Sequence, residues 1–156
     1  MSAERVGLLI HLLGAFAFVG GIITAGSAFE VARRRRSAVE IAAVLKVSRV
    51  GAVVAVIGGV VLLVGGFWLA GHLGVFRTRW LQASVLAFLL SFLLGMVGGR
   101  RPRKARELAT SIASGGEGNV DEMRALINDR AALFVNYLSA ALALAVLVLM
   151  VWQPNF

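Results

Sequence analysis

The chain has 156 residues, of which 59% are hydrophobic, and it carries a net charge of +8. A soluble domain is nearer half apolar, so this composition is typical of a membrane protein. The sequence has no cysteine, which excludes disulfides, thiolate metal sites and cysteine nucleophiles. The basic residues lie at the ends of apolar runs, as in loops that flank membrane helices, so we expect no nucleic-acid partner.

Four segments are long and apolar enough to cross a bilayer, whose hydrocarbon core needs about 20 apolar residues per helix. In chain order they cover residues 6–29, 50–69, 80–98 and 131–151. The sequence therefore predicts an all-α fold, with residues 1–156 forming a single integral membrane domain. We expect a four-helix transmembrane bundle with long connections at residues 30–49 and 99–130.

The basic residues are distributed unevenly between the two sides of this bundle. All of them except Arg5, Arg77 and Arg79 lie in the connections 30–49 and 99–130. Because Lys and Arg concentrate in cytoplasmic loops, this pattern predicts both termini outside the cytoplasm, in a protein of the bacterial inner membrane. Three tryptophans fall at the opposite, outer boundary, as in an aromatic belt: Trp68, Trp80 and Trp152.

Helical segments are also predicted inside the two long connections. Residues 38–49 lack helix breakers and can extend the second span. Asn119 lies three residues before Glu122, which resembles a capping box, and the helix that starts there can run unbroken from Val120 into the fourth span. Residues 103–113 are predicted to form a short surface helix whose basic end can lie on anionic headgroups.

Small residues recur at helical spacing in the first two spans. Helices in lipid associate through such residues, because small side chains let the backbones approach. We therefore expect these two spans to form an antiparallel pair, and the Leu- and Phe-rich third and fourth spans to face lipid or a partner. A Gly-lined face can also make room for a flat cofactor. The small residues are Gly14, Ala17, Gly21 and Ala25 in the first span and Gly51, Ala55, Gly58, Gly59 and Gly65 in the second.

The two histidines of the chain, His11 and His72, each end one of these small-residue seams. A neutral imidazole inside a bundle suits haem iron as an axial ligand, so both are candidate ligands of a haem b. The alternative for His11 is a hydrogen bond to a neighbouring helix, with Tyr137, Asn136 and Ser91 as candidate partners. The alternative for His72 is an ordinary residue at the membrane boundary. Helix rise puts the two imidazoles at different depths, which disfavours one shared haem.

The spans contain no Asp or Glu, whereas proton-coupled transporters use a titratable group at depth. The sequence also contains no nucleophile–base pair, phosphate loop, carboxylate dyad or metal-ligand spacing, so we expect no catalysis by side chains alone. Glu30 lies at the inner edge of the first span and Arg49 at the start of the second. We expect these two residues to form an ion pair.

Two stretches of the chain resemble a known family. They are His11-Leu12-Leu13-Gly14-Ala15, followed by Val19-Gly20-Gly21, and Thr78-Arg79-Trp80-Leu81-Gln82-Ala83-Ser84, followed by Gly95 and the basic run from Arg100 to Arg106. They resemble a bacterial family of small predicted integral membrane proteins of unknown function, which is distantly similar to CopD-type copper-resistance membrane proteins. The resemblance implies a four-span fold with a histidine in the first span. Some related-looking four-span families handle haem with a first-span histidine, which would correspond to His11.

These patterns lead to three functional hypotheses. The first is a non-catalytic accessory or scaffolding subunit of a larger membrane complex, in contact with lipid and with other membrane subunits or a second copy of itself. The second is a haem b protein, for electron transfer or haem handling, that uses His11 with or without His72. The third is a transporter of a small solute or a metal ion.

Overall fold

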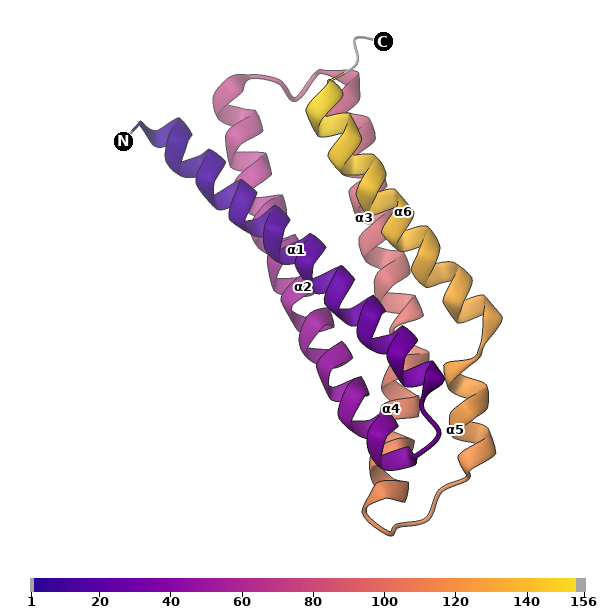
Figure 1. Ribbon diagram of the computed structural model, residues 1–156. Helices are drawn as coiled ribbons and strands as arrows, with labels where there is room; N and C mark the ends of the chain where they lie inside the picture. The colour runs from indigo at the N-terminus through magenta and orange to yellow at the C-terminus, as the bar shows by residue number, and fades with distance from the viewer. Residues whose placement is uncertain (1, 154–156) are drawn as a thin grey trace.

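The computed structural model describes residues 2–153, which form six α-helices (Figure 1). The all-α fold class is confirmed. In chain order the helices are α1 (Ala3–Arg34), α2 (Ala38–Leu73), α3 (Arg79–Gly98), α4 (Arg100–Ala113), α5 (Val120–Ile127) and α6 (Arg130–Trp152).

Four helical segments within residues 2–153 are long and apolar enough to cross a membrane, and they contain the four predicted spans. Many of their large apolar side chains, such as Phe16 and Val151, point away from the bundle and are exposed. Exposed apolar surface of this extent suits contact with lipid tails. The segments are Ala3–Arg34, Ala38–Leu73, Arg79–Ala113 and Val120–Trp152.

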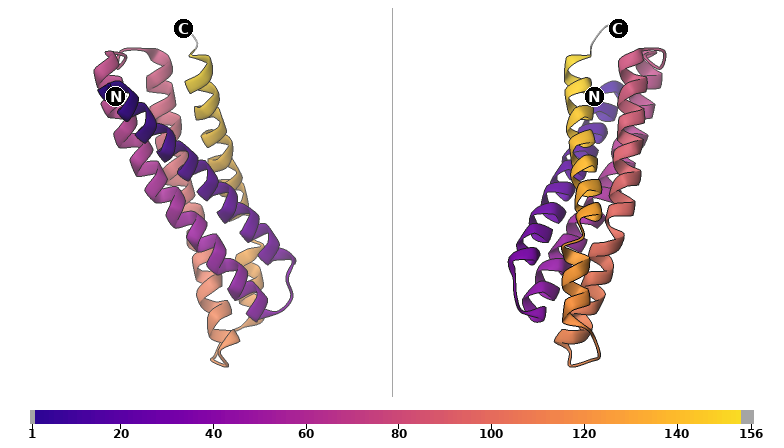
Figure 2. Two further views of the ribbon diagram at one scale, coloured as in Figure 1. Left: turned by 60° about the vertical axis from the view of Figure 1, so that its left-hand side comes forward. Right: turned by 90° about the vertical axis from the view of Figure 1, so that its right-hand side faces the viewer.

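The helices are arranged as two antiparallel pairs, α1 with α2 and α3 with α6 (Figures 1 and 2). The start of α1, the α2–α3 connection and the end of α6 lie at one end of the bundle. The α1–α2 connection, α4 and α5 lie at the other end, which we call the basic end because it carries the connections rich in Arg and Lys.

α4 continues the direction of α3 after a single-residue interruption at Gly99 (Figure 1). Gly99 keeps helical backbone angles (φ −71°, ψ −12°), and its N–H still donates to the Gly95 carbonyl at 3.0 Å. Pro102 has no N–H to donate to the preceding turn, which interrupts the hydrogen-bond ladder here. The helix predicted at residues 103–113 therefore begins earlier, at Arg100, as an extension of the third span.

The expectation of an unbroken helix from Val120 into the fourth span is wrong. α5 begins after Asn119, whose side chain accepts two backbone N–H groups, but the chain leaves the helix at Asn128. Asp129 then adopts extended backbone, and its carboxylate accepts the N–H of Ala132 at 2.9 Å. Asp is a preferred N-cap residue, so it starts α6 instead of continuing α5.

Buried side chains form two cores, one within the spans and one at the basic end. At the basic end, Ala105 and Ala109 of α4 and Met123 of α5 are completely buried. The helix predicted to lie on the surface therefore buries one face against α2 and α5. The core within the spans contains Phe18, Ala55, Leu62, Phe88, Ala143 and Val146, and the basic-end core contains Phe29, Ala32, Ile41, Ala42, Leu45, Ala105, Ala109, Met123, Leu126 and Ile127.

Candidate functional site

α1 and α2 meet backbone to backbone along a seam of glycines. A methyl group added at Gly14 would overlap the backbone of Leu62, and one added at Gly21 would overlap the backbone of Ala55. No side chain larger than hydrogen fits at either glycine without moving one of the two helices. Gly14 and Gly21, two of the small residues predicted to bring the first two spans together, therefore lie at the closest approach of α1 and α2.

The α2 side of the same seam is equally tight. A methyl group at Gly51 would overlap the backbone of Ala25, and one at Gly58 would overlap the backbone and side chain of Ala17. The hydroxyl of Ser48 adds a polar contact, because it donates to the Ala25 carbonyl at 3.0 Å. The seam thus spans the middle of both helices, from Gly14 to Ala25 on α1 and from Ser48 to Leu62 on α2.

Gly59 lies on a different face of α2 from the other seam glycines. A methyl group there would come within 3.1 Å of Phe92 and 3.2 Å of Phe18. Phe18 packs against Phe88 with ring centroids 5.2 Å apart, and Phe88 stacks on Phe92 at 6.0 Å. These aromatic rings, and not a small-residue face, join the α1–α2 pair to α3.

The His11 imidazole binds α2 directly. Its Nδ1 lies 3.0 Å from the Leu62 carbonyl oxygen. A carbonyl can only accept, so Nδ1 carries the proton and Nε2 of the neutral ring keeps its lone pair. Gly66 makes room for the ring, because a methyl group there would lie 3.0 Å from Nδ1 and Cε1, and Gly65 lies beside the His11 backbone.

The expected kind of contact for His11, a hydrogen bond to a neighbouring helix, is therefore present, but its partner is not Tyr137, Asn136 or Ser91. The role of Gly66 was missed as well. The signal that could have located it is the four-residue step from Leu62 to Gly66, since a helical carbonyl at position i lies beside residue i+4.

His72 lies elsewhere on α2. It is exposed and stacks on Trp68 with ring centroids 5.1 Å apart and an interplanar angle of 11°. His72 follows Gly66, the neighbour of His11, by six residues, which corresponds to roughly 9 Å along the helix axis. The structure does not bring the two imidazoles together.

Ser91 of α3 and Ser139 of α6 form a reciprocal pair that sequence reasoning missed. The Ser91 hydroxyl donates to the Ser139 carbonyl at 2.8 Å, and the Ser139 hydroxyl donates to the Ser91 carbonyl at 2.7 Å. Both side chains are buried. The third and fourth spans are therefore joined to each other and do not only face lipid or a partner.

The expected ion pair between Glu30 and Arg49 is wrong. The Glu30 carboxylate accepts from Arg33 at 2.9 and 3.1 Å and from the Tyr137 hydroxyl at 2.7 Å. Arg33 lies one turn from Glu30 on the same helix, so it reaches the carboxylate easily. Arg49 follows Ser48, which contacts α1, and the 100° step of the helix turns Arg49 toward α4 instead.

The three tryptophans predicted to form an outer belt lie near helix ends at the end of the bundle opposite the basic end (Figure 1). Trp68 also packs against α1, because a methyl group at Gly7 would overlap its ring. Trp152 is exposed near the end of α6. Among residues 2–153, no three His, Asp or Glu side chains are close enough to hold a metal ion together.

Four apolar helices, joined by glycine seams and by hydrogen bonds that end on backbone carbonyls, define a multi-pass integral membrane protein. The family model described as "Predicted integral membrane protein (DUF2269)" matches residues 6–154, and the chain belongs to this family. No curated protein and no solved structure matches the chain.

Proposed function

We propose that the protein is a non-catalytic subunit that holds other components of a membrane assembly in place. The observation that carries the proposal is the use of the polar groups that lie between the bundle helices. Those of His11, Ser48, Ser91 and Ser139 all bind the backbone of a neighbouring helix. Every buried side-chain nitrogen or oxygen within residues 2–153 has a hydrogen-bond partner. These groups support a fixed arrangement of helices.

The glycine seam supports a scaffold more than a transporter. Alternating access requires helices or bundles to rock against one another around a central site. At Gly14, Gly21, Gly51 and Gly58, by contrast, α1 and α2 are in backbone contact over more than a third of the length of α1. Close-packed interfaces of this kind resist sliding.

Gentle extraction tests the scaffold proposal. The tagged protein, expressed at its natural level and extracted in a mild detergent, is expected to migrate on a native gel together with other membrane proteins or further copies. Mass spectrometry of the purified complex then identifies the bound chains. A single 16.5 kDa polypeptide with lipid alone would overturn the proposal.

A second candidate function, haem binding, is favoured by the hydrogen bond of His11. Metal-binding histidines usually donate their other ring N–H to a carbonyl or carboxylate, which fixes the ring and leaves a lone pair for the metal. His11 has this arrangement, with Nδ1 on the Leu62 carbonyl and Nε2 left as the donor atom for iron. A haem would supply redox chemistry at this level of the bundle.

The visible spectrum tests this second function directly. Protein purified after expression with ample haem should show a Soret band that His11→Ala abolishes and that His72→Ala leaves in place. His72→Ala is the matched control, because its ring stacks on Trp68 and is not joined to His11. A colourless preparation, or a band unchanged in His11→Ala, would exclude haem at His11.

A further inference from the structure

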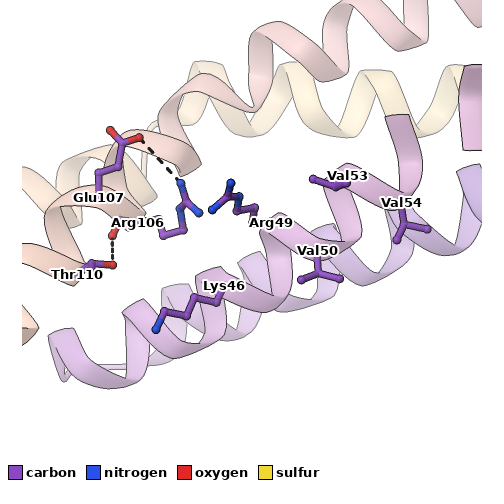
Figure 3. Close-up of a pocket in the computed structure, with 8 residues that line it drawn as sticks. All are labelled: Lys46, Arg49, Val50, Val53, Val54, Arg106, Glu107 and Thr110. Carbon is purple, nitrogen blue, oxygen red and sulfur yellow. Dashed lines mark hydrogen bonds and ion pairs between the residues drawn. The ribbon is translucent and has the colours of Figure 1, made fainter. Parts of the chain in front are cut away.

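The groove between α2 and α4 combines cations with an apolar wall. It has a volume of about 700 Å³ and is lined by Lys46, Arg49, Val50, Val53, Val54, Arg106, Glu107 and Thr110 (Figure 3). Lys46, Arg49, Val50 and Val53 follow the i, i+3, i+4, i+7 spacing of one helix face. α2 therefore contributes a strip that is basic toward the basic end and apolar toward the middle of the bundle.

The two arginines of the groove come from different helices and face one space. Figure 3 shows the guanidinium groups of Arg49 and Arg106 directed toward each other between α2 and α4. Neither Lys46 nor Arg49 forms an ion pair within residues 2–153. Glu107 lies closer to Arg103, at 3.1 Å, than to Arg106, at 3.9 Å. The groove therefore holds an excess of positive charge.

The position of the groove matches the boundary between headgroups and hydrocarbon. Arg49 immediately precedes the second predicted span, which begins at residue 50, and the three valines lie within that span. The valines are exposed, with 61%, 49% and 39% of Val50, Val53 and Val54 accessible. A ligand that fits this pattern has an anionic head and an apolar tail that extends toward the bilayer centre.

We propose that this groove binds one anionic phospholipid of the leaflet at the basic end, with its phosphate between Arg49 and Arg106. Guanidinium groups recognise phosphate oxygens by paired hydrogen bonds, and two of them from separate helices can hold one phosphate. Lys46, one turn before Arg49, adds a third charge to the headgroup region. An acyl chain lies along Val50, Val53 and Val54. The proposal rests on the four membrane-spanning helices and is independent of the scaffold and haem functions.

The test uses full-length protein in nanodiscs of phosphatidylglycerol and phosphatidylcholine in equal amounts. Native mass spectrometry of the released protein counts which lipid stays bound. The unaltered protein should retain phosphatidylglycerol in preference to phosphatidylcholine. Arg49→Gln with Arg106→Gln should weaken this preference, by roughly five-fold for each charge removed. The charge-retaining variant, Arg49→Lys with Arg106→Lys, should keep most of it.

The matched control removes two charges from the same end of the molecule but outside the groove. Arg34 and Arg36 lie near the α1–α2 connection and are exposed, and Arg34→Gln with Arg36→Gln should leave the preference unchanged. An equal loss in both double variants would show attraction to the basic end as a whole and would overturn the proposal. The absence of any preference in the unaltered protein would also overturn it.

A second experiment distinguishes a bound lipid from a bound free anion. Val53→Trp fills the apolar wall but keeps all three cations, so it should reduce phosphatidylglycerol retention if the ligand has an acyl chain. Retention that survives Val53→Trp but is displaced by millimolar inorganic phosphate would assign the groove to free phosphate and overturn the lipid assignment. Circular dichroism of each variant shows that the helices are intact.

Discussion

At the scale of single residues, two neighbouring glycines of α1 show how specific the seam is. A methyl group at Gly21 would overlap the backbone of Ala55, whereas one at Gly20 would meet no atom within 4 Å. Residue type alone does not distinguish the two glycines, but the packing of α1 against α2 requires only Gly21. The difference follows from the 100° rotation between consecutive helical residues, which turns Gly21 toward α2 and Gly20 toward open space.

Gly21→Ala should therefore lower the free energy of unfolding by about 1–3 kcal/mol, the usual range when a close-packed interface is overfilled. Gly20→Ala should leave it unchanged or raise it by up to about 1 kcal/mol, because Ala is the better helix former. Far-UV circular dichroism during SDS titration from mixed micelles measures both. Equal effects of the two substitutions would show that α1 and α2 do not meet at Gly21.

The small-residue faces of the first two spans could be predicted from the sequence, because helical spacing alone defines them. The partners of individual polar groups could not. His11 binds Leu62, and Glu30 binds Tyr137 from α6, 107 residues away. These contacts depend on how two helices are rotated and shifted along their axes relative to each other. Residue spacing within one helix does not determine either quantity.

At the scale of helices, the α3–α6 pair is held differently from the α1–α2 pair. Its buried polar contact is the reciprocal exchange between Ser91 and Ser139, in which each hydroxyl binds the backbone of the other helix. Gly98 of α3 also lies against Asn136 of α6. Hydroxyls used in this way are a known means of joining helices where the hydrophobic effect is absent.

Ser91→Ala and Ser139→Ala should each lower the free energy of unfolding, measured in the same SDS titration, by about 1 kcal/mol, because each substitution removes one hydroxyl that donates to the backbone of the other helix. Ser84→Ala provides the comparison, because the Ser84 hydroxyl donates within its own helix to the Trp80 carbonyl at 2.8 Å. Ser84→Ala should therefore change the free energy of unfolding by less than either of the other two substitutions. Ser91→Ala and Ser139→Ala variants that are as stable as the unaltered protein would mean that these serines do not join α3 to α6.

A helix start can be predicted from the sequence where a typical N-cap residue precedes it. Asn119 begins α5 as its sequence indicates, and Asp129 carries an equally readable signal, a capping residue directly before an apolar run. The interpretation of Val120 onward as one helix overlooked that signal. The burial of α4 could not be read from its sequence, because Ala105 and Ala109 are small, and the residues that cover them come from other helices.

At the scale of the whole molecule, the gathering of basic residues at one end predicts its orientation. From the positive-inside rule we predict that the basic end lies in the cytoplasm and that both chain ends lie outside it. Because the chain has no cysteine, a single cysteine can be introduced as the only reactive thiol. Its reaction with a membrane-impermeant reagent then shows on which side of the membrane it lies. Ser114, near α4, and Arg77, in the α2–α3 connection, are exposed positions at opposite ends.

Arg77→Cys should react with a membrane-impermeant maleimide in spheroplasts, and Ser114→Cys should react only after lysis. Gel-shift of the labelled protein measures the modified fraction. If Ser114→Cys reacted in intact spheroplasts and Arg77→Cys were protected, the orientation in the membrane would be opposite to the predicted one. His11 and the tryptophans would then lie toward the cytoplasm.

The length of α2 has a mechanical consequence. Its 36 residues extend roughly 54 Å, well beyond a hydrocarbon core of about 30 Å. This one unbroken helix carries the glycine seam near its middle and Ile41 and Leu45 of the basic-end core near its start, so it fixes the distance between the seam and that core. Deleting Lys46, Val47 and Ser48, which is close to one turn of α2, would bring the basic-end core about 4.5 Å closer to the seam.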